Sequence, residues 1–120
     1  MKRNWDVIRE VLITVEGLDA KSSQEHHYDV SEDDDRGEVE HAVLLWKAGF
    51  LEGIDGSAMD GSYLIATGLT WQGHELLETM RSKPVWESIK STAREKGVEL
   101  TFDAVKTLGA MALKAVLGSS

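Results

Sequence analysis

The apolar positions of this chain recur at helical spacing in several separate stretches, and glycines stand near the ends of these stretches. The first helix is predicted from Trp5 to about Gly17, with Asn4 as its N-cap. Residues 18–31 lack sustained periodicity, so we predict a loop there, with room for one short helical turn. The apolar stripe of the helix comprises Trp5, Ile8, Leu12 and Val15, widened by Val11.

The next stretch combines a helix with two short strands. The helix is predicted to begin at Ser31, and its uninterrupted part is predicted from Glu38 to Ala48, because Gly37 interrupts its start. Its apolar face comprises Val39, Ala42, Val43 and Trp46, with Leu45 beside them. A short strand follows from Phe50 to Ile54. The Asp/Gly-rich segment 55–62 then predicts a hairpin loop, and residues 63–69 form the return strand, with Tyr63, Ile65 and Thr67 on one face.

Three further helices complete the predicted elements, and their ends are marked by Thr70, Pro84 and Thr101. A helix followed by a glycine-rich hairpin is typical of a winged helix-turn-helix. We therefore predict an α+β fold, mainly α with a small β-hairpin: a winged-helix-like domain over residues 1–83 and a C-terminal helical extension over 84–120. The expected buried positions of the three helices are Leu76, Leu77 and Met80 with Trp71; Val85, Trp86, Ile89 and Ala93; and Phe102, Val105, Leu108, Ala112 and Val116, widened by Met111 and Leu117.

Composition narrows the class of protein. The chain has 120 residues, 42% of them apolar, which suits one core of ordinary size. The absence of cysteine excludes disulfides, thiolate zinc sites and cysteine nucleophiles. No apolar run approaches the roughly 20 residues that span a bilayer, so we expect no membrane association and a cytoplasmic protein. Gly118–Ser120 reads as a frayed end that need not be native.

The net charge is −8, and the acidic residues are unevenly distributed. Residues 31–56 hold eight acidic and two basic residues, a net charge of −6, whereas residues 84–120 hold four acidic and five basic residues, a net charge of +1. The helix from Glu38 to Ala48 stands where a winged helix has its recognition helix, yet glutamates on its outward side would repel phosphates. We expect an acidic interaction face comprising Asp33, Asp34, Asp35, Glu38, Glu40, His41 and Lys47.

Nucleic-acid binding is the alternative, and the charge disfavours it. A duplex binder usually carries a basic stripe, because phosphate contacts supply most of the non-specific affinity. The basic residues available for phosphate contacts in that alternative are Lys2, Arg3, Arg9, Arg81 and Lys83.

No catalytic or metal site is predicted, and no cofactor. His26 and His27 with Asp29 are adjacent in an irregular segment, where side chains seldom converge on one ion. The acidic run at 33–35 lacks the alternating ligands of a calcium loop. His74 and its neighbour Glu75 point about 100° apart on a helix and form no dyad.

Two predictions concern packing between elements. The four tryptophans, one on each of four helices, are expected to meet in one core, because large aromatic side chains on apolar stripes bury most area there. The last helix has broad apolar coverage, so we expect it to form a homodimer interface. Its interface residues would be Phe102, Val105, Leu108, Met111, Ala112 and Val116.

Two segments of the chain resemble a family of uncharacterised bacterial and phage proteins. They are LTWQGHE at 69–75, followed by Arg81 and Val85-Trp86, and LWKAGF at 45–50. The opening MKRN with Ile8 is similar as well, so the resemblance covers nearly the whole chain. It implies a phage or prophage accessory protein with no established catalytic residues, and residues 18–37 depart from the family's pattern. The predicted function is therefore a non-enzymatic, acidic protein-interaction module; the alternative is a dimeric winged-helix DNA-binding regulator.

Overall fold

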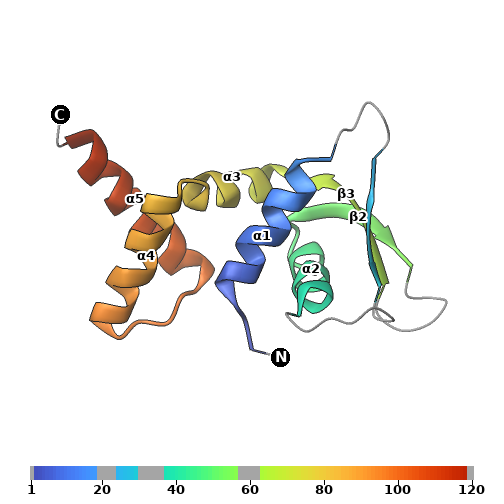
Figure 1. Ribbon diagram of the computed structural model, residues 1–120, viewed down its shortest axis with the longest axis horizontal. Coiled ribbons are helices and arrows are strands. Elements are labelled where there is room, and N and C mark those ends of the chain that lie inside the picture. Colours follow the sequence, from blue (N-terminus) through green and yellow to red (C-terminus); the bar gives the residue numbers. More distant parts are fainter. Residues whose placement is uncertain (1, 19–23, 30–36, 57–62, 119–120) are drawn as a thin grey trace. The chain divides into compact units, whose positions relative to one another are not determined.

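The computed structural model describes residues 2–18, 24–29, 37–56 and 63–118 (Figure 1). The described residues form five helices and one antiparallel sheet of three strands, which confirms the predicted α+β class. The chain divides into two compact units, Met1–His74 and Glu75–Ser120. The elements in chain order are α1 (Trp5–Glu16), β1 (His26–Asp29), α2 (Glu38–Lys47), β2 (Leu51–Asp55), β3 (Tyr63–Leu69), α3 (Trp71–Met80), α4 (Lys83–Lys96) and α5 (Phe102–Gly118).

The N-terminal unit consists of α1 and α2 packed on a sheet with the strand order β1-β3-β2. The central strand β3 buries Leu64 and Ala66, whereas Ile65 and Thr67, on the alternate face, are only half-buried. Helix α1 begins at the predicted cap, where the Asn4 side chain accepts hydrogen bonds from the backbone amides of Asp6 and Val7. The core of this unit comprises Val7, Ile8, Val11, Leu12, Val15, Tyr28, Val39, Ala42, Leu45, Leu51, Leu64, Ala66 and Leu69.

Strand β1 corrects the prediction of a loop over residues 18–31. Residues 26–29 pair antiparallel with β3, so that Tyr28 stands opposite Leu64 and His26 opposite Ala66. The sequence His-His-Tyr-Asp has one large apolar position and gives no alternation to detect. Residues 26–29 are extended because they pair with the edge of β3 that β2 leaves open.

The start of α2 agrees with the predicted uninterrupted part of this helix. Gly37 is the N-cap and has a left-handed conformation, with φ of 73°, and the helix begins at Glu38. Ser31 and the acidic run at 33–35 lie outside the described residues.

His41 is buried, with 2% of its surface exposed, so its prediction as part of an outward face was wrong. Its Nε2 accepts a hydrogen bond of 2.8 Å from the Asn4 backbone amide, and its Nδ1 lies 2.7 Å from the Gly37 carbonyl. The amide must donate, so Nδ1 carries the proton of a neutral ring and donates to Gly37. His41 thereby connects the N-terminal ends of both helices. The buried face of α2 comprises Val39, His41, Ala42 and Leu45.

The two segments that carry the family resemblance meet at one corner of the N-terminal unit. The Thr70 backbone amide donates to the Phe50 carbonyl at 3.1 Å, and its hydroxyl donates to the Gly49 carbonyl at 2.6 Å. The same hydroxyl accepts a bond from the Gly73 amide, as expected of a helix cap. A Cβ atom at Gly73 would stand 2.1 Å from the Phe50 carbonyl oxygen. Glycine is therefore required for α3 to approach this backbone.

The prediction of a core built from four tryptophans was wrong. Trp86 of α4 is buried, with 2% of its surface exposed, whereas Trp71 at the start of α3 is 79% exposed. Trp5 and Trp46 are half-buried. Trp71 stands next to the cap residue Thr70, so its direction is fixed by the backbone of that corner and not by the apolar stripe of Leu76, Leu77 and Met80, which are buried as predicted.

The C-terminal unit is helical, and α4 packs against α5. Helix α4 has Ser82 as its N-cap and Pro84 in its first turn, and it ends at Gly97, whose φ is 67°. A Cβ atom at Gly109 would stand 2.3 Å from the Thr79 Cγ2 atom, so α5 lies very close to this side chain. The buried side chains of this unit comprise Leu76, Leu77, Met80, Trp86, Ile89, Ala93 and Val105.

The two predicted strands β2 and β3 are confirmed as an antiparallel pair, and residues 57–62 of the predicted hairpin loop lie outside the described residues. In a helix-turn-helix, two helices follow one another across a short turn. Helices α1 and α2 are separated by β1, and residues 30–36 are outside the described part. The winged-helix interpretation therefore stays a prediction.

Candidate ligand-binding pocket

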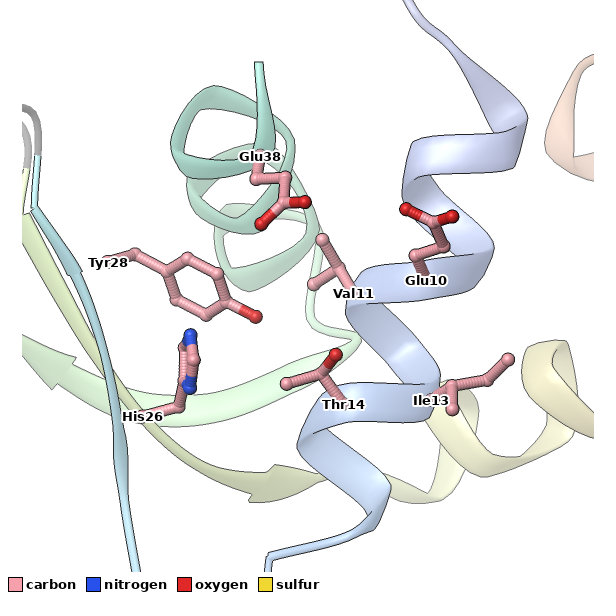
Figure 2. Close-up of a pocket in the computed structure, with 7 residues that line it drawn as sticks. All are labelled: Glu10, Val11, Ile13, Thr14, His26, Tyr28 and Glu38. Atoms are coloured by element: carbon pink, nitrogen blue, oxygen red, sulfur yellow. The ribbon is translucent and has the colours of Figure 1, made fainter. Parts of the chain in front are cut away.

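A pocket of about 340 Å³ lies between α1, β1 and the start of α2, within the N-terminal unit (Figure 2). Such a volume is at the small end of ligand pockets, which span about 300–1,000 Å³. Helix α1 lines it along one side, β1 contributes two aromatic rings, and α2 contributes its first residue. The lining residues are Glu10, Val11, Ile13, Thr14, His26, Tyr28 and Glu38.

The rings of His26 and Tyr28 form one wall of the pocket. They stand two residues apart on β1, so both side chains lie on the same face of the sheet, and their ring centroids are 4.5 Å apart. His27, between them, points to the other face and is exposed, and its Nε2 lies 3.0 Å from a carboxylate oxygen of Glu25. Strand alternation therefore separates the two histidines.

Tyr28 is a buried polar side chain, with 3% of its surface exposed. Figure 2 shows its ring extending from β1 toward α1, with the hydroxyl directed at the helix near Val11 and Thr14. Burial, and then the negative charge of Glu38, raise the pKa of Tyr28 well above its ordinary value. The phenol is therefore neutral at physiological pH and can both donate and accept a hydrogen bond.

Two carboxylates reach the pocket from different helices. Glu10 stands on α1, and Glu38 is the first residue of α2, where the positive end of the helix dipole favours a negative charge. The residues described as lining the pocket include no lysine and no arginine. The arrangement offers hydrogen-bond acceptors, negative charge and aromatic faces, which together suit a cationic group.

The predicted acidic face is only partly assembled in the described residues. Glu40 and Lys47 are exposed on α2, as expected, while Glu38 is half-buried and turned to the pocket and His41 is buried. The remaining predicted members of the face, Asp33, Asp34 and Asp35, lie outside the described residues.

The basic residues named for phosphate contacts belong to both units. Lys2 and Arg3 are exposed before α1, and Arg9 is half-buried on that helix. Arg81 and Lys83 are exposed in the C-terminal unit, and the Arg81 guanidinium makes two hydrogen bonds with one carboxylate oxygen of Glu78. Part of the charge of Arg81 is thus compensated within its own unit.

The predicted dimer helix α5 divides into two halves. Val105 is buried and Phe102, Leu108 and Ala112 are half-buried, so the first half packs within its own unit. The side chain of Val116 lies outside the described residues. The second half exposes large apolar side chains, with exposed fractions of 52% for Met111, 53% for Leu113 and 68% for Leu117.

Most of the pocket was missed by the sequence reasoning, which singled out Glu38 but not its neighbours. Glu10 and Thr14 share one side of α1 at a spacing of four residues, and this signal was available. The signal from Tyr28 and His26 depended on recognising a strand in the segment predicted as a loop. Within the described ranges, no group of three or more His, Asp or Glu side chains is placed to hold a metal ion.

The fold and the pocket define a small α+β protein with an acidic, aromatic-lined cavity in its N-terminal unit. Residues 2–99 match the family of hypothetical proteins DUF2513, and the chain belongs to that family. It is 41% identical over 106 residues to an uncharacterized protein of Haemophilus influenzae, covering 88% of this chain and 90% of that protein. The resemblance to a family of uncharacterised proteins is thus confirmed. No solved structure matches the chain.

Among the described residues, no helix has the length and apolar character needed to cross a membrane.

Proposed function

We propose that the protein is a non-catalytic interaction module whose N-terminal unit binds a basic segment of another cytoplasmic protein. The observation that carries this proposal is the division of charge between the units. Residues 1–74 hold fifteen acidic and six basic residues, a net charge of −9, whereas residues 75–120 hold six acidic and seven basic residues, a net charge of +1. A field of one sign over one unit steers oppositely charged partners toward it and repels partners of the same sign.

The alternative function is a dimeric DNA-binding regulator. The basic residues of α1 and of the segment before it favour it, but they belong to the unit with the net charge of −9. Glu38 and Glu40 stand in the first turn of α2, the helix that would approach the major groove. Repulsion of phosphates by these groups disfavours the alternative.

A binding assay at low salt separates the two functions. A labelled lysine-rich peptide and a labelled random duplex are titrated separately with the full chain, and fluorescence anisotropy reports binding. The proposal expects the peptide to bind, with an affinity that falls as salt increases, and the duplex to stay free. Binding of the duplex without binding of the peptide would contradict the proposal. A phage or prophage setting for the partner stays a prediction from the sequence resemblance.

Homodimerisation is a separate proposal, supported by the exposed apolar side chains on the second half of α5. Three such residues in two turns form more apolar surface than isolated exposed positions on a monomer. Light scattering of the intact protein is expected to give the mass of a dimer, and the double variant Leu113→Lys with Leu117→Lys that of a monomer. A monomer mass for the unaltered chain would overturn this proposal.

A further inference from the structure

The Tyr28 hydroxyl lacks a hydrogen-bond partner within the part of the chain that the structure describes. The side chain is 97% buried, since 3% of its surface is exposed, and its hydroxyl lines the pocket. Among the described residues, every fully buried side-chain oxygen or nitrogen has a hydrogen-bond partner, so the Tyr28 hydroxyl itself faces the open space of the pocket. A ligand group that enters the pocket can therefore form a hydrogen bond with this hydroxyl in place of water.

The charge around this hydroxyl selects the kind of group that can enter. Glu38 lies close enough to act on the titration of Tyr28, and Glu10 approaches from the facing helix α1 (Figure 2). An anionic ligand would be repelled by both carboxylates. A cation brings its own hydrogen-bond donors to the two carboxylates and to the phenol oxygen, and the face of the Tyr28 ring attracts positive charge.

The apolar part of the lining constrains the shape of the ligand. Val11 and Ile13 of α1 line the pocket beside the polar groups, which suits a group with a hydrocarbon stem and a charged end. The volume of about 340 Å³ corresponds to a small ligand or to one side chain of a larger partner.

From this geometry we infer that the pocket receives one lysine or arginine side chain of the partner's basic segment, with its charged end between Glu10, Glu38 and the Tyr28 hydroxyl. The inference rests on the proposed function, because it assigns to one pocket the recognition that the charge of the N-terminal unit makes favourable. Beyond the proposed function, we infer that one basic side chain is inserted into the pocket and that Tyr28 forms a specific hydrogen bond with it.

The test compares variants that alter the pocket with variants that alter only the charge of the surface. Glu38→Gln and Glu40→Gln remove the same charge from the same helix, but only Glu38 lines the pocket. With the lysine-rich peptide, Glu38→Gln is expected to weaken binding about tenfold or more, as for loss of a charge-assisted hydrogen bond, and Glu40→Gln less than about threefold. Equal weakening by both variants would overturn the pocket while leaving the acidic module intact.

Tyr28→Phe provides a second test, because a purely electrostatic attraction would leave the affinity of this variant for the peptide unchanged. The substitution removes one hydroxyl and leaves the net charge unchanged, so the inference predicts an affinity about threefold to tenfold lower. The folded protein loses no described hydrogen bond, so its thermal midpoint is expected to stay within about 2 °C. An unchanged affinity for this variant would contradict the role of Tyr28.

Two further probes identify the source of the cation. The peptide with acetylated lysines keeps the stems but loses the charges, and it is expected not to bind. Butylamine, which has a comparable stem and ammonium without a peptide, is expected to compete only at concentrations far above those of the peptide. Competition by butylamine at the peptide's own concentration would show that the site binds a free amine and would overturn the assignment to a peptide side chain. Failure of the unaltered protein to bind the peptide at all would overturn the proposed function itself.

Discussion

Both units of this small protein contain helices, but the units differ in the interactions that hold these helices in place. In the N-terminal unit, polar side chains make specific contacts: the buried His41 links the starts of two helices, the half-buried Thr70 bonds to the Gly49 carbonyl and caps α3, and the buried Tyr28 lines a pocket. The C-terminal unit uses apolar packing of α4 and α5, with a near-neutral charge and an exposed apolar helix end.

This difference indicates where specificity resides. A buried polar group is tolerated when its hydrogen bonds are made, and it then fixes one arrangement of the backbone. Apolar helix packing tolerates more substitutions of similar volume. We therefore expect small substitutions to lower the free energy of unfolding more in the N-terminal unit than in the C-terminal unit, where apolar side chains can repack.

The strongest test of that contrast is Gly73→Ala in α3. The added Cβ atom would stand 2.1 Å from the Phe50 carbonyl oxygen, and a backbone atom held by the Thr70 amide cannot move aside cheaply. We expect the free energy of unfolding to fall by about 3 kcal/mol, measured by urea denaturation, although alanine favours a helix interior. A loss below about 1 kcal/mol would show that the corner is not rigid.

The next effect is expected at His41. In His41→Ala, the Asn4 amide and the Gly37 carbonyl lose their partner and a buried ring is removed, so the free energy of unfolding should fall by about 2 kcal/mol. The matched control is Glu40→Ala, an exposed neighbour on the same helix, with an expected change within about 0.5 kcal/mol. Similar losses for both variants would mean that the two hydrogen bonds contribute little.

Gly109→Ala in α5 should be milder, because the added Cβ atom meets a side-chain methyl and not a backbone oxygen. The Thr79 Cγ2 atom at 2.3 Å can rotate away, so we expect a loss of about 1 kcal/mol in chemical denaturation. In a Thr79→Ser background the methyl is absent, and Gly109→Ala should then raise stability by a few tenths of a kcal/mol through helix propensity. If the serine background gives no rescue, the close approach of α5 to Thr79 is not what limits this position.

The smallest predicted effect is on alkaline stability. Because the pKa of Tyr28 is raised in the folded protein, its neutral form contributes stability that is complete below the unfolded value of about 10 and is lost as the pH rises above it. Relative to Tyr28→Phe, the unaltered chain should lose about 0.8 kcal/mol between neutral pH and pH 10.5. Parallel stability curves for the two proteins across this range would contradict the burial of the phenol.

The helices could be predicted from the sequence because caps and apolar spacing are local properties. Asn4, Pro84 and Gly97 stand where the predicted ends require them. Strand β1 could not be predicted, since its extended conformation comes from pairing with β3, which lies more than thirty residues later. The burial of His41 depends on the backbone amide of Asn4, the N-cap of α1, and the exposure of Trp71 depends on the Thr70 corner.

The pocket could be predicted only in part from the sequence, because most of its lining residues come together through tertiary packing. Glu38 was identified from the acidic pattern of its segment, whereas Glu10, Thr14, His26 and Tyr28 come together through packing of α1 against the sheet. Charge asymmetry between segments, in contrast, is a property of the sequence and needed no structure.

Residue-resolved NMR of the intact protein during titration with the lysine-rich peptide tests most directly whether the N-terminal unit is the binding unit. The expected result is a set of shift changes centred on the ring of Tyr28 and on the amides around Glu10 and Glu38, with residues 75–120 unaffected. Shift changes centred on α4 and α5, with Tyr28 unmoved, would contradict the assignment of binding to the acidic pocket.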